Sequence, residues 1–275
     1  MSTILIFGSR GMLGRYISSY FNGYKLIKID RKILDIYQAI KNNTINTYIK
    51  DLITVQKPDV IINCAGVTNK RDVSLGEMYA VNSLFPVILD SIAYSINAKI
   101  NIVYPTTDCI YSGKDGMYSK FHKCDCEDNY GLSKMFGENT INTCIIRASI
   151  IGEEIRGDSL LEWVRSNKGN RINGYVNHFW NGITCLEYAK LVKELVVNNT
   201  FWKGVKHVVS SFGEKEYITK YELVNLISEI YELNVTVIPI ETQTKNDRSL
   251  LYDIKTKDIR EQIIEMKQYN INQYS

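Results

Sequence analysis

Tyr130 and Lys134 form a Tyr-x-x-x-Lys pair inside a segment, 130–139, that predicts a helix. The i, i+4 spacing places the phenol and the ammonium on one face of that helix. A nearby cation stabilises a phenolate and lowers the pKa of tyrosine from about 10 toward neutrality, so the pair could donate and accept a proton. Such pairs also occur by chance in helices, so the reading depends on the elements around them.

A hydroxyl is expected beside this pair. Thr107 follows the predicted strand 99–104 and precedes Tyr130 by 23 residues. In open α/β sheets, substrates bind at the carboxyl ends of the strands. We therefore predict Thr107, Tyr130 and Lys134 as the catalytic group of an enzyme.

A glycine-rich turn follows the first predicted strand, 3–7, and opens the first predicted helix. Its glycines allow a tight turn and a close approach to a pyrophosphate, which the N–H groups at the helix start would stabilise. We expect this turn to bind a dinucleotide. The residues are Gly8, Ser9, Arg10, Gly11, Met12, Leu13 and Gly14.

The second predicted strand, 24–30, ends at Asp30, whose carboxylate could accept the ribose 2′-OH of NAD. Arg31 follows it and Arg10 lies in the glycine turn, so two guanidiniums could instead hold the 2′-phosphate of NADP. We predict NADP as the cofactor, and NAD stays open.

Strands and helices alternate through the first half of the chain, which predicts an α/β fold with a doubly wound, parallel Rossmann sheet. Beyond about residue 150 the pattern loosens, although three helix starts carry a Ser/Thr-x-x-Glu capping signature at Ser159, Thr184 and Thr219. We expect residues 1–150 to be an NAD(P)-binding Rossmann domain. Residues 151–275 would be a smaller mixed α/β substrate lobe, part of which can return to the Rossmann domain.

The composition supports a globular protein: 45% of the residues are hydrophobic, 23% are charged, and the mean hydropathy is −0.17. The net charge of +3 comes without a basic block and argues against nucleic acid as a partner. No uncharged apolar run of 18 residues and no export signal occur, so we expect no membrane span and a cytoplasmic protein with six reduced cysteines. His122, Cys124 and Cys126 are spaced too closely for a zinc site, so no metal is expected.

These motifs resemble those of extended short-chain dehydrogenase/reductases, in particular the dTDP-4-dehydrorhamnose reductases. The resemblance covers nearly the whole chain and is most specific over residues 1–150. The glycine turn also resembles that of GDP-L-fucose synthases, which are epimerase/reductases. Further segments that carry the resemblance are 57–66, 81–82, 107–113, 130–134 and 247–250.

The resemblance implies NADPH-dependent reduction of the 4-keto group of a nucleotide-linked 4-dehydro-6-deoxyhexose. Tyr130 would protonate the C4 alkoxide, Thr107 would hydrogen-bond the same oxygen beside Asp108, and Lys134 would hold the nicotinamide ribose. Residues Cys64, Ala65 and Gly66 would complete the cofactor site. The nucleotide (UDP, dTDP or GDP) and the group at sugar C2 (rhamnose or N-acetylrhamnosamine type) stay open, as does a homodimer through long helices such as 76–97.

Cys109 departs from the tyrosine that dehydrorhamnose reductases commonly carry, whereas fucose synthases carry a cysteine there and pair it with a histidine. His178 lies 44 residues after Lys134 and is the candidate partner. The resemblance thus implies an additional 3- or 3,5-epimerase activity through Cys109 and His178. The alternative is a buried, apolar Cys109 and a surface His178.

In the second half, Trp180 and Asn181 are predicted to contact the sugar nucleotide, with Trp180 stacking on a ring, and Arg248 to pair with its diphosphate. A core tryptophan and a surface ion pair are the alternatives. A competing function is a non-catalytic regulatory subunit like the methionine adenosyltransferase β subunit. The presence of Thr107, Tyr130 and Lys134 favours the enzyme, and Cys109 argues against a 4,6-dehydratase, which needs an acidic residue there.

Overall fold

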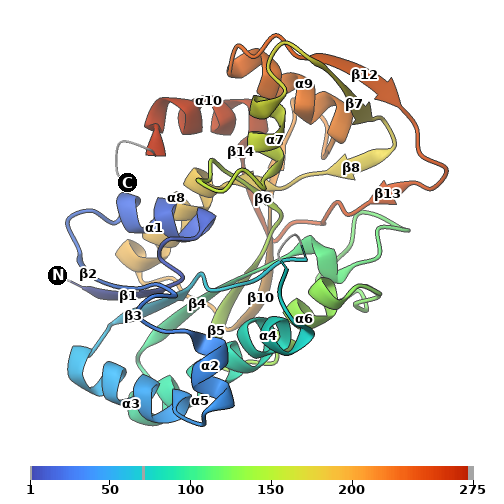
Figure 1. Cartoon of the computed structure of the whole chain (residues 1–275). Coiled ribbons are helices and arrows are strands. Elements are labelled where there is room, and N and C mark those ends of the chain that lie inside the picture. Colours follow the sequence, from blue (N-terminus) through green and yellow to red (C-terminus); the bar gives the residue numbers. More distant parts are fainter. Residues whose placement is uncertain (1, 70–71, 272–275) are drawn as a thin grey trace.

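A seven-stranded parallel sheet forms the centre of the molecule (Figure 1). The structure is a computed structural model and describes residues 2–69 and 72–271. The strand order is β14-β10-β5-β4-β3-β1-β2, and each neighbouring pair is parallel. The strands are β1 (Thr3–Phe7), β2 (Lys25–Ile29), β3 (Val60–Asn63), β4 (Asn101–Thr106), β5 (Thr143–Arg147), β10 (Gly204–Ser211) and β14 (Ile254–Asp258). The predicted doubly wound Rossmann sheet is confirmed.

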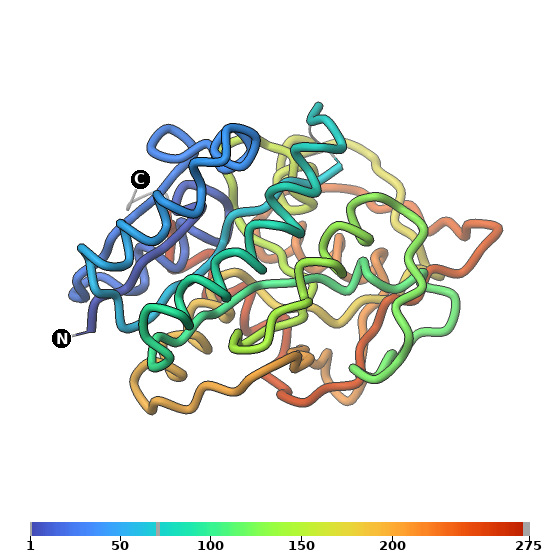
Figure 2. The backbone as a smooth tube through the Cα atoms, turned by 90° about the horizontal axis from the view of Figure 1, so that it is seen from below, coloured from blue at the N-terminus to red at the C-terminus, as the bar shows by residue number. Residues whose placement is uncertain are grey.

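Helices cover both faces of this sheet, as the nearly continuous apolar strands require (Figures 1 and 2). Ile4 and Ile6 of β1 pack into one cluster with α1, α8 and α10, whereas Leu5 and Phe7 pack into another with α3 and α5. This alternation is the two-residue period of a strand. The helices are α1 (Met12–Tyr20), α2 (Ile36–Lys41), α3 (Ile45–Gln56), α5 (Phe85–Ile96), α6 (Asn129–Gly137), α8 (Cys185–Asn198) and α10 (Ile259–Tyr269).

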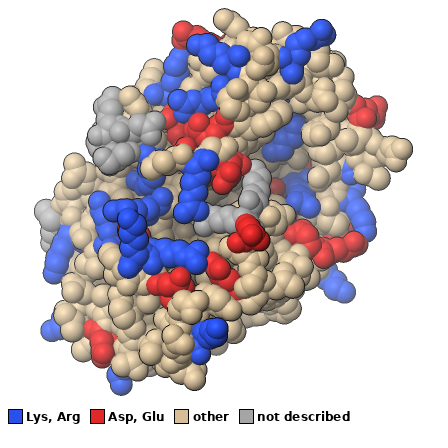
Figure 3. All heavy atoms as spheres, viewed as in Figure 1, with Lys and Arg blue, Asp and Glu red and all other residues tan. Residues whose placement is uncertain are grey.

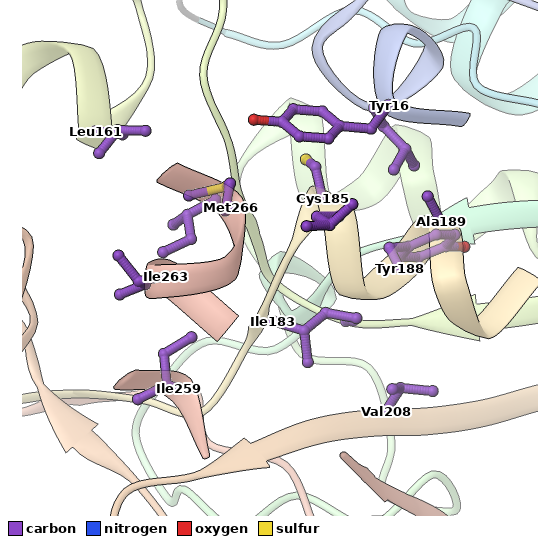
Figure 4. Packing of buried hydrophobic residues seen from close by; sticks show 14 of the residues in the cluster. Tyr16, Leu161, Ile183, Cys185, Tyr188, Ala189, Val208, Ile259, Ile263 and Met266 are labelled. Atoms are coloured by element: carbon purple, nitrogen blue, oxygen red, sulfur yellow. The ribbon is translucent and has the colours of Figure 1, made fainter. Parts of the chain in front are cut away.

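The larger cluster joins the two halves of the chain. Figure 4 shows Tyr16 from α1, Cys185 and Tyr188 from α8, and Ile263 and Met266 from α10 gathered in one packed region. All five side chains are fully buried. The second half is therefore packed onto the sheet through a common core.

The second half also supplies two strands of the large sheet, since β10 pairs with β5, and β14 pairs with β10. Its remaining elements form a lobe beside the carboxyl ends of the strands (Figure 1). This lobe has small sheets of two or three strands. Its elements are β6 (Ile150–Ile151), α7 (Leu160–Ser166), β7 (Arg171–Tyr175), β8 (His178–Trp180), β9 (Ile183–Thr184), β11 (Ile218–Thr219), α9 (Lys220–Ile230), β12 (Thr236–Ile240) and β13 (Asn246–Asp247).

The three predicted capping signatures all start helices. Ser159, Thr184 and Thr219 cap α7, α8 and α9 by accepting from the backbone N–H three residues later. At Thr219 the return bond from its own N–H to Glu222 is also present. Local sequence thus sets where these helices begin.

The long helix predicted before β4 is interrupted. It consists of α4 (Leu75–Tyr79), a π-helical turn η1 (Ala80–Leu84) and α5. By length and composition alone Leu75–Ile96 could cross a membrane, but half of its apolar window is buried inside the fold. Phe85 and Leu89 are fully buried against the sheet, which is the environment of a core helix.

The strand order 2-1-3-4-5 reverses direction between β1 and β3. In doubly wound sheets the crevice at such a reversal, outside the carboxyl ends of the strands, is where ligands bind. The glycine turn after β1 and residues 64–66 after β3 lie on either side of it.

Candidate active site

The glycine turn lies directly against the segment after β3. Gly8 has a φ of +70°, and a Cβ there would lie 2.6 Å from the backbone N of Ala65. A Cβ on Gly14 would lie 2.2 Å from the carbonyl oxygen of Gly8. The N-cap of α1 is Gly11, which has no side chain to satisfy the first N–H groups of the helix. These N–H groups are thus left for an anionic ligand such as a diphosphate.

A cavity of about 310 Å³ opens at this place. Apolar side chains, including those of Ile29, Leu34 and Val67, form one part of its wall. Residues 154–156 from the loop after β6 form another part. Figure 3 shows Lys and Arg side chains gathered with Asp and Glu in the middle of the molecule, between the lobe and the sheet. Most of the predicted cofactor residues line this cavity: Gly8, Arg10, Gly11, Met12, Asp30, Arg31, Cys64, Ala65 and Gly66.

Asp30 and the two arginines are already engaged with one another or with neighbouring acids. Arg10 Nε lies 2.8 Å from one oxygen of Asp30, and the other oxygen accepts from the backbone N–H of Lys32 and of Ile33. Arg31 pairs with Asp35 and with Glu77, at 3.2 and 2.9 Å. The acidic and basic groups that would read the adenosine ribose therefore lie side by side at the end of β2.

The structure brings Tyr130 and Thr107 together, since the Thr107 side chain is close enough to the phenol to act on its pKa, in the lowering direction. Thr107 also accepts from the N–H of Cys109 and donates to Asp108 Oδ1, both at 3.1 Å. Burial, followed by the nearby Cys109, raises the pKa of Tyr130 above its usual value. The phenol is thus protonated at neutral pH and is suited to act as a proton donor.

Lys134 does not act on the phenol as the spacing predicted. Its Nζ donates to the hydroxyl of Tyr104 and to the carbonyl oxygen of Pro105, both at 2.8 Å. Burial lowers its pKa to about 7, against the opposing effect of Glu138. The predicted lowering of the Tyr130 pKa by Lys134 is therefore absent, because the ammonium is turned toward β4.

Cys109 has Arg248 as its cationic partner, with Arg248 Nη1 3.2 Å from the sulfur. Burial, and next the carboxylate of Asp108, raise the pKa of the Cys109 thiol to about 11. His178 instead hydrogen-bonds Thr242 at 2.8 Å, and its ring stacks on Tyr175. Burial also lowers the pKa of His178. The structure thus does not pair Cys109 with His178, which corrects the expected acid/base pair.

Two predicted substrate residues have structural roles. Trp180 is only 2% exposed and belongs to the large hydrophobic cluster, so its ring is not available for stacking on a ligand. Asn181 is buried and bonds the backbone of Leu250 through both its amide nitrogen and its oxygen. Arg248 and Asp108, by contrast, lie next to Cys109 and Thr107 at the end of β4.

A buried polar network close to the site had no signal in the sequence. Arg147 pairs with Glu138 and donates to the hydroxyl of Tyr111 and to Nε2 of His207, each at 2.8 Å. Glu138 also accepts from Thr106, the residue before Thr107. The network ties the end of α6 to the ends of β4 and β5 and to the middle of β10, and its members are too far apart in sequence to form a motif. Among residues 2–69 and 72–271, no group of three His, Cys, Asp or Glu side chains could hold a metal ion.

The sequence and the fold are similar to those of known proteins. The family model described as RmlD substrate binding domain matches residues 1–171. The fold is similar to that of a dTDP-4-dehydrorhamnose reductase from Bacillus anthracis in complex with NADP, with a TM-score of 0.83, 19% identity, and 98% of this chain and 100% of that chain covered. It is also similar to a dTDP-4-dehydrorhamnose reductase from Clostridium acetobutylicum, with a TM-score of 0.79, 22% identity, and 97% and 99% covered. No protein with a curated description matches the sequence.

Proposed function

The chain belongs to the RmlD substrate binding domain family, as its motifs predict, and we propose that it is an NADPH-dependent oxidoreductase. Its proposed reaction is reduction of the 4-keto group of a nucleotide-linked 4-dehydro-6-deoxyhexose. The observation that carries this proposal is that Thr107 and a protonated Tyr130 lie together at the carboxyl edge of the sheet, where the glycine turn also lies.

The residues around the cavity fit a dinucleotide. A Cβ at Gly8 or Gly14 would fill the space between the turn and its neighbours, and the N-cap of α1 leaves N–H groups for a diphosphate. When bound, the nicotinamide supplies the hydride. Tyr130 donates its phenolic proton to the oxygen on C4, and Thr107 hydrogen-bonds that oxygen and keeps it next to the phenol. Lys134 holds the nicotinamide ribose through its ammonium group.

NADP is favoured over NAD because Arg10 already neutralises Asp30, at 2.8 Å. The carboxylate would otherwise repel a 2′-phosphate. Arg31, 59% exposed at its side chain, can also turn toward that phosphate at modest cost. NAD remains the second candidate, since Asp30 could accept the ribose hydroxyl once Arg10 moves away.

We place the substrate between the end of β4 and the loop that carries Arg248. Asp108 and Arg248 are the proposed binding residues, and Trp180 and Asn181 are not among them because they are packed inside the lobe. Arg248 lies next to Cys109, so it would contact the sugar ring near C4 rather than the diphosphate. The division into a Rossmann domain and a nucleotide-sugar-binding lobe near residue 150 is part of this proposal.

The proposal is simple reduction, without epimerisation. An epimerase would need Cys109 as a thiolate, but burial and Asp108 raise the pKa of this thiol to about 11. A second acid/base group across the sugar is also needed, and His178 is engaged with Thr242 and Tyr175. The non-catalytic alternative has no support in the site, where Thr107, Tyr130 and Lys134 are all present at one sheet edge.

The test is NADPH oxidation against 4-keto-6-deoxy sugars linked to dTDP, UDP and GDP, with and without an acetamido group at C2. We expect one nucleotide series to be reduced, and NMR of the product gives the new stereocentre at C4. NADH is run in parallel. If no member of the panel oxidises either cofactor faster than the blank without sugar, the proposed function is wrong.

A further inference from the structure

The ammonium group of Lys134 contacts one aromatic side chain, that of Tyr104, in two ways. Its Nζ lies 2.8 Å from the hydroxyl of Tyr104 and 4.1 Å from the centre of the same ring. The carbonyl oxygen of Pro105 accepts a second N–H at 2.8 Å. An ammonium has three N–H donors, so these contacts leave one for the cofactor side.

The hydroxyl of Tyr104 is itself fixed by the π-helical turn η1. In a π-helix the hydrogen bonds run from i to i+5, and such turns occur frequently at functional sites. The carbonyl oxygen of Asn82, inside this turn, accepts the Tyr104 hydroxyl proton at 2.9 Å. Because that proton is committed to Asn82, the hydroxyl oxygen turns its lone pairs toward Lys134.

Gly137 makes room for this arrangement at the end of α6. A Cβ there would lie 2.0 Å from the carbonyl oxygen of Asn82 and 2.8 Å from the hydroxyl of Tyr104. The side chain of Asn82 also donates to Ser133 on α6, at 3.0 Å. The π turn, β4 and the catalytic helix thus meet at the Tyr104 hydroxyl.

We propose that Tyr104 is the positioning residue of Lys134: its hydroxyl, oriented by the π turn, holds the ammonium charged and directs its remaining N–H to the cofactor. The inference rests on the proposed function only for what Lys134 then binds. Tyr104 is not a proton relay, because its own proton goes to a buried backbone carbonyl from which no transfer can continue.

The surroundings of Lys134 explain why it needs the Tyr104 hydroxyl as an acceptor to stay protonated. Burial lowers the pKa of Lys134 to about 7, and the groups that oppose this effect are Glu138 on the same helix and Cys64 after β3. Burial raises the pKa of Tyr104 well above its usual value, so it stays a neutral phenol. Tyr130, the other titratable group on this side of α6, is protonated for the same reason. Loss of the Tyr104 hydroxyl would therefore favour the neutral amine.

The experiment follows Lys134 directly by NMR of the intact protein labelled with [¹³Cε]lysine, with Lys134→Met to assign its signal. In Tyr104→Phe the ring stays and the acceptor is lost, so we expect the Lys134 pKa to fall by about 1 to 2 pH units. At a pH above the shifted value, NADPH binding measured by fluorescence should weaken roughly tenfold. Tyr104→His, which offers a ring nitrogen as acceptor, should return part of the shift.

Tyr188→Phe is the matched control, since Tyr188 is also a fully buried tyrosine, and its hydroxyl has no hydrogen-bond partner in the described part of the chain. This change should leave the Lys134 signal as in the wild type. The proposal is overturned if Lys134 titrates at the same pH in the wild type and in both Tyr104 variants. The Lys134 titration is measured without substrate, so it does not depend on the proposed reductase function. A failure of that function would show only in the NADPH oxidation assay.

Discussion

Arg248 donates a hydrogen bond to the sulfur of Cys109 at 3.2 Å, which joins the loop after β13 to the end of β4. The two residues are 139 positions apart, and each comes from a different side of the proposed sugar site. The Cys109 thiol in turn points to Asp108, with 3.8 Å between its sulfur and Asp108 Oδ1. Arg248 opposes the rise in the Cys109 pKa, but burial and Asp108 outweigh it. Cys109 is therefore a neutral thiol that helps to hold Arg248 beside the proposed sugar site.

Hydrogen exchange on the substrate tests this view of Cys109. Enzyme, oxidised cofactor and a 4-keto substrate are incubated in D₂O, so that no reduction occurs. We expect deuterium at C3 and C5 to appear only at the background rate, because a thiol with a pKa of about 11 is rarely a base at pH 7.5. Cys109→Ser is the comparison. Exchange that is fast in the wild type and lost in Cys109→Ser would instead establish a built-in epimerase.

Tyr130→Phe tests the proton donor. The phenol is replaced by a ring of the same shape, so cofactor binding should stay within about twofold, while turnover falls by roughly 10²–10⁴, the usual contribution of a general acid. Steady-state kinetics and NADPH fluorescence measure the two quantities. Tyr252→Phe, at a half-exposed tyrosine whose ring contacts Lys255, serves as the control. If Tyr130→Phe turned over substrate at the wild-type rate, Tyr130 would not be the proton donor.

The pair Arg10–Asp30 should decide the choice of cofactor. Arg10→Ala removes one charge-assisted contact to the 2′-phosphate and should cost about 1.5–3 kcal/mol in kcat/KM with NADPH and little with NADH. Asp30→Asn keeps the acceptor for the N–H groups of Lys32 and Ile33 but removes the charge. It should raise the NADPH to NADH ratio roughly tenfold. Equal losses with both cofactors in Arg10→Ala would show that Arg10 does not read the phosphate.

His207 should make the protein less stable in mild acid. Its Nδ1 donates to the carbonyl oxygen of Leu251, and its Nε2 must accept from Arg147, because a guanidinium only donates. Burial, and next the charge of Arg147, lower the pKa of His207 from 6.5 to about 4. Between pH 6.5 and 4, His207 binds a proton in the unfolded chain but stays neutral in the folded protein. The free energy of unfolding therefore falls by roughly 3 kcal/mol as the pH drops over this range.

Urea unfolding at pH 7.0, 5.5 and 4.5 measures this dependence. His207→Gln, whose amide can also accept from Arg147 and donate to Leu251, should lose most of the slope above pH 4.5, because glutamine does not titrate. Paired carboxylates such as Asp253, whose pKa is lowered, contribute only at lower pH. The same slope in the wild type and in His207→Gln would mean that His207 is not the titrating group.

Features that depend on neighbouring residues could be predicted from the sequence. The glycine at position 14 is required by the carbonyl oxygen of Gly8 in the same turn, and Thr219 caps α9 through a residue three positions away. The parallel sheet follows from apolar strands separated by amphipathic helices, since both strand faces must be covered. These interactions act over short distances along the chain, so the pattern of residue types was enough to fix them.

The partners of individual side chains were decided by the tertiary structure. Spacing placed Lys134 on the same helix face as Tyr130, but the direction of its ammonium depends on Tyr104 and Pro105 from β4. Cys109 could be assigned a partner only when the loop of Arg248 had folded against it. A short-range pattern specifies which face of an element a residue occupies. The contacts of that residue, and hence its protonation state, are set by packing between segments that are far apart along the chain. No local sequence pattern indicates which of these segments will meet.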